Sequence, residues 1–187
     1  MATERISPSR RRLLATGTSL LAAAGVAAGA VPFVRAWQPG ARAQAGMAPL
    51  PVDISPLQPG QQRVVAWRGK PVFILRRSAT MLQSLAQGRH LLADPRSEAS
   101  VQPPWVDVEY RSIRPDLLVV IGLCTHLGCV PLLQVAEGSY FCPCHASRYD
   151  LAGRVYRHQP APLNLEVPPY HYAADGLIVL GSGPEAA

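Results

Sequence analysis

The stretch Cys124-Thr-His-Leu-Gly-Cys129, followed by Cys142-Pro-Cys-His-Ala-Ser147, decides how this chain is interpreted. All four cysteines and two of the five histidines of the 187-residue sequence lie in these two segments. The first contains Cys-x-His and the second Cys-x-x-His, so each loop can offer one thiolate and one imidazole. Such a set suits a binuclear iron–sulfur cluster in which one iron takes two sulfurs and the other takes two nitrogens.

Each loop has one further cysteine that this set does not need: Cys129 in the first loop and Cys144 in the second. In an oxidising compartment the simplest use for the pair is a disulfide that ties the loops together, provided that their Cα atoms come within about 7 Å. Three other uses of the same residues stay open. They are a structural zinc site, an all-cysteine cluster, of whose usual spacing only the interval from 124 to 129 is present, and two structural disulfides with incidental histidines.

The two segments resemble those of the Rieske iron–sulfur proteins found in quinol-oxidising cytochrome bc-type complexes. That family's pattern, Cys-Thr-His-Leu-Gly-Cys and then Cys-Pro-Cys-His-Gly-Ser, is met at every position except Ala146, where the family has glycine. The resemblance implies one Rieske-type 2Fe-2S cluster and a disulfide between Cys129 and Cys144. The implied metal ligands are Cys124, His126, Cys142 and His145.

The resemblance also implies roles for residues around the cluster. Ser147 and Tyr149 would donate hydrogen bonds to its sulfur atoms, unless both merely complete a turn. Among the ligands, His145 would be the catalytic contact to quinol, because its second nitrogen can take up a proton when the iron is reduced. We expect Leu127 to dock against the membrane subunit, the alternative being ordinary packing.

The segment Pro160-Ala-Pro162 resembles the family's proline loop, which covers the cluster. The residue before this loop is usually glycine in the family, whereas this chain has Gln159, so the course of the loop is open at this point.

Outside the two loops, the N-terminal region has a composition of its own. Residues 1–50 contain six arginines and one glutamate, and so account for five of the six net positive charges. The basic balance therefore describes the N-terminus and does not predict nucleic-acid binding. Residues 1–12 resemble a cytoplasmic twin-arginine export signal. Residues 13–37 contain an uncharged run from Leu13 to Val34, which predicts one transmembrane helix with its N-terminus in the cytoplasm.

Two features between this helix and the rest of the chain allow alternatives. The small residues Ala43-Gln-Ala45 can serve as a cleavage site, but the resemblance favours a signal anchor that is not cleaved. Residues 38–51 are rich in Pro, Gly and Ala, which predicts a linker. It is either a passive spacer or, as the resemblance implies, a flexible hinge that lets the head move.

Residues 52–187 have short runs of β-branched and aromatic residues between turn residues. We expect a hairpin from 63–67 and 70–75, a helix over 78–87 capped by Ser78 or Thr80 and stopped at Gly88, and two strands between the loops. Further strands are expected at 105–110, 117–121, 163–167 and 176–180. The predicted class is all-β: a Rieske-type antiparallel β sandwich with a small cluster-binding subdomain at about 122–162.

The resemblance implies the Rieske subunit of a bacterial ubiquinol–cytochrome c reductase, an oxidoreductase and translocase in which this chain is not active alone. The expected partners are the cytochrome b subunit, a c-type cytochrome, ubiquinol and the lipid bilayer, in a dimeric complex of the inner membrane with the head in the periplasm. Two alternatives stay open: the small Rieske subunit of a periplasmic oxidase such as arsenite oxidase, and a stand-alone Rieske electron carrier.

Overall fold

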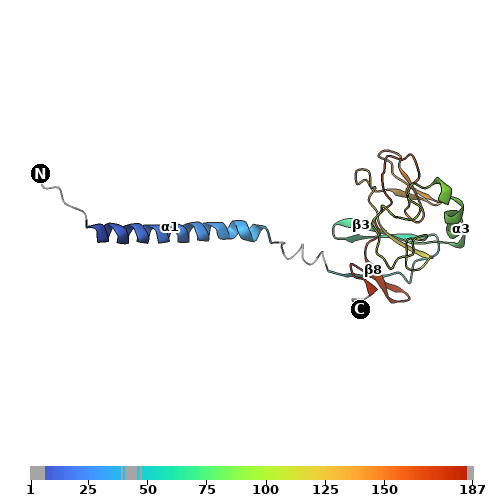
Figure 1. The fold of residues 1–187 in the computed structure, drawn as a ribbon. Helices are drawn as coiled ribbons and strands as arrows, with labels where there is room; N and C mark the ends of the chain where they lie inside the picture. The colour runs from blue at the N-terminus through green and yellow to red at the C-terminus, as the bar shows by residue number, and fades with distance from the viewer. Residues whose placement is uncertain (1–6, 39, 41–45, 47, 185–187) are drawn as a thin grey trace. The chain divides into compact units, whose positions relative to one another are not determined.

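The computed structural model of the chain describes residues 7–38, 40, 46 and 48–184, in two compact units that divide between residues 45 and 46. The first unit is dominated by helix α1, Pro8–Ala36 (Figure 1). At 1.5 Å per residue its 29 residues extend for about 43 Å, enough to cross the hydrocarbon core of a bilayer. Its most apolar window has a mean hydropathy of 1.6, and none of its side chains is buried. The predicted N-terminal apolar helix is confirmed.

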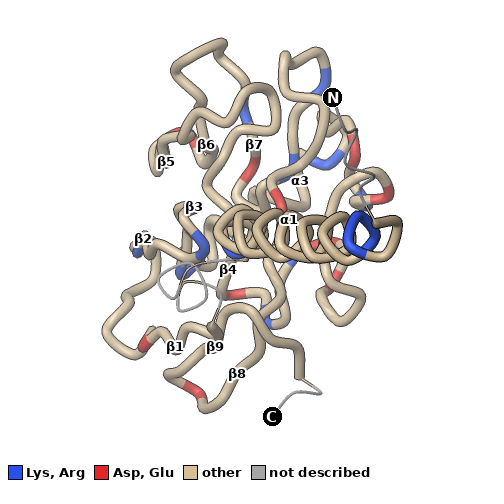
Figure 2. The backbone as a smooth tube through the Cα atoms, turned by 90° about the vertical axis from the view of Figure 1, so that its left-hand side faces the viewer, with Lys and Arg blue, Asp and Glu red and all other residues tan. Residues whose placement is uncertain are grey.

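The second unit, which we call the head, contains three antiparallel sheets of three strands (Figure 2). One sheet has the order β1 (Leu50–Asp53), β9 (Leu177–Leu180) and β8 (Tyr170–Ala174). The next has the order β2 (Gln62–Trp67), β3 (Lys70–Arg76) and β4 (Leu117–Ile121). The third sheet has the order β5 (Leu132–Gln134), β6 (Ser139–Phe141) and β7 (Arg148–Asp150). The predicted all-β class with antiparallel pairing is confirmed.

The middle sheet forms the core that supports the loops. Strands β2 and β3 pair from Gln62↔Leu75 to Trp67↔Lys70 as the predicted hairpin, and the two turn residues Arg68 and Gly69 have φ of 51° and 73°. Positive φ at both positions matches the twist of the flanking strands. All five residues of β4 are buried, and this strand leads directly into the first cysteine loop. The first loop therefore begins on a rigid element.

Helix α3, Ala79–Gln87, is the predicted helix of the head. Its N-cap is Ser78, whose hydroxyl accepts a hydrogen bond from the Met81 backbone N–H at 3.3 Å. It ends at Gly88 as predicted, and a short 3-10 helix η1, Arg89–Leu91, follows. Met81 and Leu85 are its buried residues, so the helix packs on the core through one face.

Two predicted strands are wrong. Residues 105–110 form turns, because the Asp107 carboxylate accepts hydrogen bonds from the backbone N–H groups of Glu109 and Tyr110 at 2.9 and 2.8 Å. Aspartate side chains compete with strand pairing in this way. Residues 163–167 lie in no sheet, since their backbone groups bond to separate partners, such as Leu165 N–H to the Gly153 carbonyl.

The predictions for the segment between the units are not resolved by the structure. Ala43-Gln-Ala45, the possible cleavage site, lies outside the described residues, as does most of 38–47. Whether residues 38–51 act as a hinge or as a passive spacer stays a prediction.

Candidate metal centre

The two cysteine loops have the same backbone geometry. In the first loop the Cys124 N–H donates to the carbonyl of Cys129 at 2.7 Å, and the Gly128 N–H donates to the carbonyl of Cys124 at 2.8 Å. In the second loop, Cys142 bonds to Ser147 and Ala146 to Cys142 in the same pattern, at 2.8 and 3.0 Å. Each loop thus closes on itself, and equivalent positions on the two loops hold the cysteines at 124 and 142.

The equivalence extends to backbone strain. The residue before the end of each loop has a left-handed conformation, with φ of 79° at Gly128 and 62° at Ala146. Glycine adopts this region without steric cost, whereas a residue with a Cβ pays about 1–2 kcal/mol. Ala146, the one position in the two cysteine loops at which the chain differs from the family pattern, is therefore a position where glycine relieves strain.

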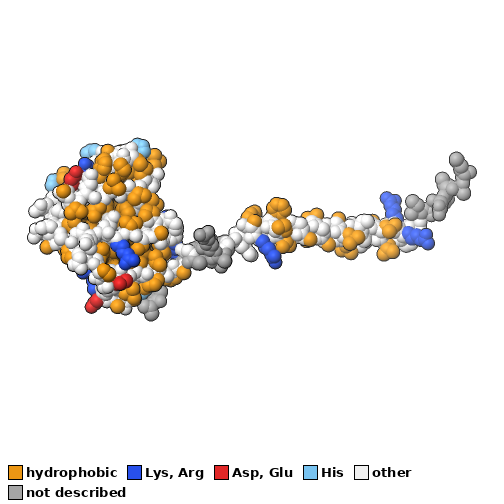
Figure 3. Space-filling model, turned by 180° about the vertical axis from the view of Figure 1, so that it is seen from behind, with side chains coloured by type: hydrophobic (Ala, Val, Ile, Leu, Met, Phe, Trp, Pro, Cys, Tyr) orange, Lys and Arg blue, Asp and Glu red, His pale blue; other side chains and the backbone are white. Residues whose placement is uncertain are grey.

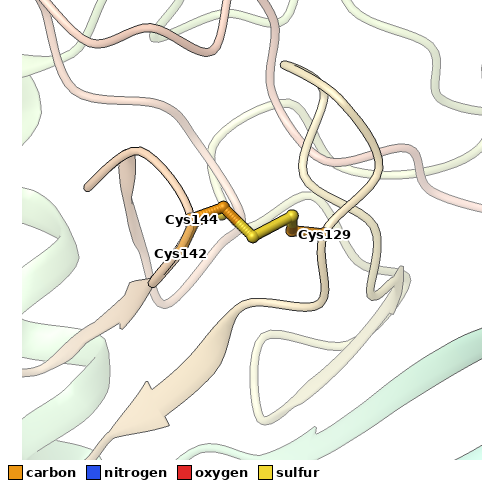
Figure 4. Close-up of side chains that lie close together, drawn as sticks. All are labelled: Cys129, Cys142 and Cys144. Carbon is orange, nitrogen blue, oxygen red and sulfur yellow. A yellow bond between two sulfur atoms is a disulfide. The ribbon is translucent and has the colours of Figure 1, made fainter.

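A disulfide joins the two loops. Cys129 and Cys144 are bonded, with their Cα atoms 6.6 Å apart (Figure 4). The sulfur of Cys142 lies within 4.8 Å of both bonded sulfurs, but a bonded cysteine has no thiolate to offer a metal. The two remaining cysteines, Cys124 and Cys142, are free and buried, which excludes the alternative of two disulfides in this structure.

The two histidines of the loops lie beside each other. The ring centroids of His126 and His145 are 4.6 Å apart with an interplanar angle of 87°. His145 is exposed and His126 is half-buried, yet Nδ1 of His126 is buried without a hydrogen-bond partner among the described residues. A buried nitrogen of this kind is costly unless something occupies its lone pair. A metal ion would satisfy it.

These donors fit a binuclear iron–sulfur cluster with mixed ligands. The disulfide removes two of the four cysteines, so the loops retain two thiols and two imidazoles. That set is too poor in thiolate for an all-cysteine cluster and matches the two-sulfur, two-nitrogen ligation of Rieske centres. Zinc accepts the same atoms, so the donor types alone do not separate zinc from the iron cluster.

Tyr149 is placed to influence the sulfur of Cys124. Its hydroxyl donates to Cys124 Sγ at 3.2 Å, and accepts a hydrogen bond from the Thr125 N–H at 3.1 Å. Burial raises the pKa of the Cys124 thiol, but the hydrogen bond from Tyr149 and further donors outweigh it, so the pKa lies below its usual value. At Cys142 burial prevails and raises the thiol pKa. The thiolate is therefore favoured at Cys124.

Both ligand loops hold the proline loop through hydroxyl groups. Ser147 is fully buried, and its Oγ accepts a hydrogen bond from the Ala161 N–H at 3.0 Å. Thr125 Oγ1 donates to the Leu163 carbonyl at 2.7 Å. The hydrogen bond from Thr125 to Leu163 was not predicted, because the two residues are 38 positions apart and no local sequence pattern indicates the contact. The Ser147 proton is not used by the bond to Ala161 and can be donated elsewhere.

The structure shows the entry to the proline loop, whose course the sequence left open. Gln159 does not have the left-handed conformation that would call for glycine; His158, one residue earlier, has φ of 59°. The Gln159 side chain accepts a hydrogen bond from the Arg148 N–H at 3.1 Å, which fixes the loop against β7. Pro160 and Pro162 are exposed, and Ala161 between them is buried.

A group of buried charged side chains, which includes Asp150 of β7, was also not predicted. The Asp150 carboxylate accepts a hydrogen bond from Arg154 Nε at 2.7 Å, and both side chains are almost completely buried. Burial also lowers the pKa of Arg77 and of Arg111 to about 10. Arg77 and Arg111 donate to backbone carbonyls at Leu151 and at Ala152 and Gly153. These bonds fix the turn that follows β7.

Figure 3 shows histidine side chains in the upper part of the head, with hydrophobic side chains near them. Leu127, which directly follows His126 in the first loop, is 71 % exposed. Packing within the head therefore does not account for most of this side chain.

Comparison with known protein families finds two matches. Residues 1–40 match "Ubiquitinol-cytochrome C reductase Fe-S subunit TAT signal", and residues 52–170 match "Rieske [2Fe-2S] domain". A ubiquinol-cytochrome c reductase iron-sulfur subunit from Allochromatium vinosum is 43 % identical over 191 residues, which cover 97 % of this chain and 92 % of that protein.

Two further relatives have the same name. The protein from Bradyrhizobium diazoefficiens is 42 % identical over 93 % of this chain and 95 % of its own length. The protein from Blastochloris viridis is 44 % identical over 94 % of each chain.

Proposed function

The chain belongs to the Rieske [2Fe-2S] family, among the iron–sulfur subunits of ubiquinol–cytochrome c reductase, and from this premise we propose that it takes one electron from ubiquinol and passes it to a c-type cytochrome. Its cofactor is one Rieske-type [2Fe-2S] cluster. When bound, this cluster supplies one-electron chemistry at a higher potential than an all-cysteine cluster, because two ligands are neutral imidazoles. Two adjacent imidazoles and two free, buried thiols, one of each kind on each of the two loops, carry the proposal.

The proposed ligands are Cys124 and Cys142 for one iron and His126 and His145 for the other. Three observations support this assignment: the two thiols are free and buried, the disulfide occupies the other two cysteines, and Nδ1 of His126 is buried without a partner among the described residues.

His145 is the proposed contact to ubiquinol. It is the more exposed of the two imidazoles, so a quinol hydroxyl can reach its free ring nitrogen. That nitrogen accepts a hydrogen bond from the quinol and takes up its proton as the electron leaves, since a more electron-rich metal makes the bound imidazole more basic. Proton and electron thus leave the quinol together.

We further propose that the chain works only within its complex. Leu127 docks against the cytochrome b subunit, Pro160 and Pro162 shield the cluster from water, and a c-type cytochrome receives the electron in a dimeric assembly. The exposure of Leu127 supports a contact of this kind. Alone, the chain would turn over no quinol.

Helix α1 supports a membrane-anchored location. We propose that it spans the bacterial inner membrane once, with residues 1–12 in the cytoplasm and the head in the periplasm. Protein extracted from membranes should keep its arginine-rich start; N-terminal sequencing that begins near Gly46 would contradict an uncleaved anchor.

Copurification tests the function. Tagged full-length chain, extracted in mild detergent, should carry b-type and c-type haem in its difference spectrum and oxidise quinol with cytochrome c as acceptor. His145→Gln should abolish this activity, whereas Glu98→Gln, at an exposed residue outside the two loops, should leave it unchanged. A molybdenum subunit in place of haem would point to a periplasmic oxidase, and a chain without partners to a stand-alone carrier.

A further inference from the structure

A pocket of about 340 Å³ lies in the head next to the entry of the proline loop. It is lined by His90, Leu91, Tyr156, Arg157 and His158. Residues 90 and 91 come from η1, and the other three come from the segment that leads to the proline loop. None of these residues belongs to the proposed cluster site.

The walls of the pocket are held together by backbone hydrogen bonds. The Arg157 N–H donates to the Leu91 carbonyl at 2.8 Å, and the Ala93 N–H donates to the Val155 carbonyl at 3.0 Å. Leu92 and Tyr156 form an antiparallel bridge between the two segments. Arg157 Nε also donates to the Leu92 carbonyl at 3.0 Å. The pocket is therefore built by paired chain segments, not by a loose contact of side chains.

The polar side chains of the pocket share one electrostatic character. Arginine is always charged, and imidazole and phenol can both donate hydrogen bonds. No carboxylate lines the pocket. Nearby Glu109 is 3.6 Å from Arg89, outside the pocket, and among the described residues no carboxylate pairs with Arg157. All four polar side chains can thus donate hydrogen bonds, and their combined charge is positive.

His158 adds a second observation. Its φ of 59° is unfavourable for a side chain with a Cβ. Glycine would relieve the strain, yet the chain has an imidazole there, beside Arg157 and lining the same pocket as His90. Strained residues of this kind concentrate at ligand sites, where the strain is part of how the site is built.

We propose that this pocket binds a phosphate group, either as free inorganic phosphate or as the phosphate of an anionic lipid headgroup. The guanidinium of arginine and the N–H groups of imidazole donate hydrogen bonds to phosphate oxygens. A transition metal is a poorer match, because only two imidazoles line the pocket and the guanidinium of Arg157 repels a cation. Leu91, 50 % exposed, adds an apolar rim that suits a lipid headgroup.

Calorimetric titration of the full-length holoprotein in neutral detergent with inorganic phosphate tests the proposal. Saturable binding is expected, and Arg157→Gln should weaken it about tenfold or more, which is the usual effect of removing one charged hydrogen-bond donor. Arg96→Gln, an exposed arginine outside the pocket, is the matched control and should change the affinity less than about twofold. Iron content measured on every variant ensures that only folded, cluster-loaded protein is compared.

Two further variants and a titration with lipid-doped micelles complete the test. Because Arg157 also supports the pocket wall, His90→Gln and His158→Gly should each weaken binding by at least about threefold without that complication. Micelles doped with phosphatidylglycerol distinguish the sources: binding to them that depends on Arg157, with no saturation by free phosphate, identifies the lipid. Absence of both kinds of binding, or equal affinities in the arginine variants at 157 and 96, would overturn the proposal.

Discussion

The hydroxyl of Tyr149 donates a hydrogen bond to Sγ of Cys124 across 3.2 Å, and so joins the strand after the second loop to the first thiol of the first loop. The bond links residues 25 positions apart. A donor to a ligand sulfur stabilises the reduced, more negative state of the centre more than the oxidised state.

Tyr149→Phe should therefore lower the midpoint potential of the centre. A hydrogen bond to a charged group contributes about 1.5–3 kcal/mol, and one-electron potentials change by about 59 mV for each tenfold change in equilibrium constant. We expect a decrease of about 65–130 mV, measured by protein-film voltammetry, with iron content unchanged. Tyr156→Phe, at an aromatic residue outside the ligand loops, is the control. An unaltered potential would remove Tyr149 from the centre.

Ser147→Ala should affect both the potential and the proline loop. The Ser147 oxygen already accepts the Ala161 N–H, so its proton is free for a sulfur atom of the centre. Loss of that proton should lower the potential by about 50 mV or more, and loss of the acceptor should speed hydrogen exchange at the Ala161 amide. Faster exchange with an unchanged potential would mean that Ser147 supports the loop only.

The disulfide should stabilise the head by closing a loop. Cys129 and Cys144 are 15 residues apart, for which chain entropy predicts about 3 kcal/mol. The double variant Cys129→Ser, Cys144→Ser should lower the free energy of unfolding in urea by about that amount and release iron faster. Treatment of the unmodified chain with a thiol reductant is the matched experiment. A double variant that unfolds like the parent would show that the two loops are held by other contacts.

The buried pair Asp150 and Arg154 should be costly to break. Removal of one partner leaves an uncompensated charge in the interior, so Asp150→Asn should destabilise the head by about 3–5 kcal/mol. The exposed pair of Arg96 and Glu98, 3.4 Å apart, gives the comparison. There, Glu98→Gln should change the free energy of unfolding by less than about 0.5 kcal/mol. Equal losses in the two variants, measured by urea denaturation, would contradict this account.

The sequence allowed prediction of those parts that depend on residues close together in the chain. The hairpin at Arg68-Gly69, the cap at Ser78 and the buried strand 117–121 follow from local patterns, and all three are present. The two cysteine loops were visible because their donors are separated by only a few residues.

Contacts between distant segments were not predictable. Arg77 bonds to the Leu151 carbonyl across 74 residues, and Thr125 bonds to Leu163 across 38. The sequence on either side of such residues does not indicate which distant residue they contact. The alternation at 105–110 was misleading for the opposite reason, since one local side chain, Asp107, took the backbone N–H groups that a strand would have used.

The matched geometry of the two loops leads to a paired prediction. Gly128 and Ala146 occupy equivalent positions in the two loops, with φ of 79° and 62°. Removal of the Cβ at 146 and addition of a Cβ at 128 should therefore change the free energy of unfolding in opposite directions. Ala146→Gly should raise the free energy of unfolding by about 1 kcal/mol, and Gly128→Ala should lower it by about 1–2 kcal/mol. No atom lies within 4 Å of a Cβ placed on Gly128, so the loss there reports backbone strain and not a clash. Thermal unfolding of both variants, with iron release as a second readout, measures the effect. If Ala146→Gly destabilised the head, the left-handed conformation at position 146 would be favoured by something other than the closure of its loop, and the equivalence of the two loops would have to be abandoned.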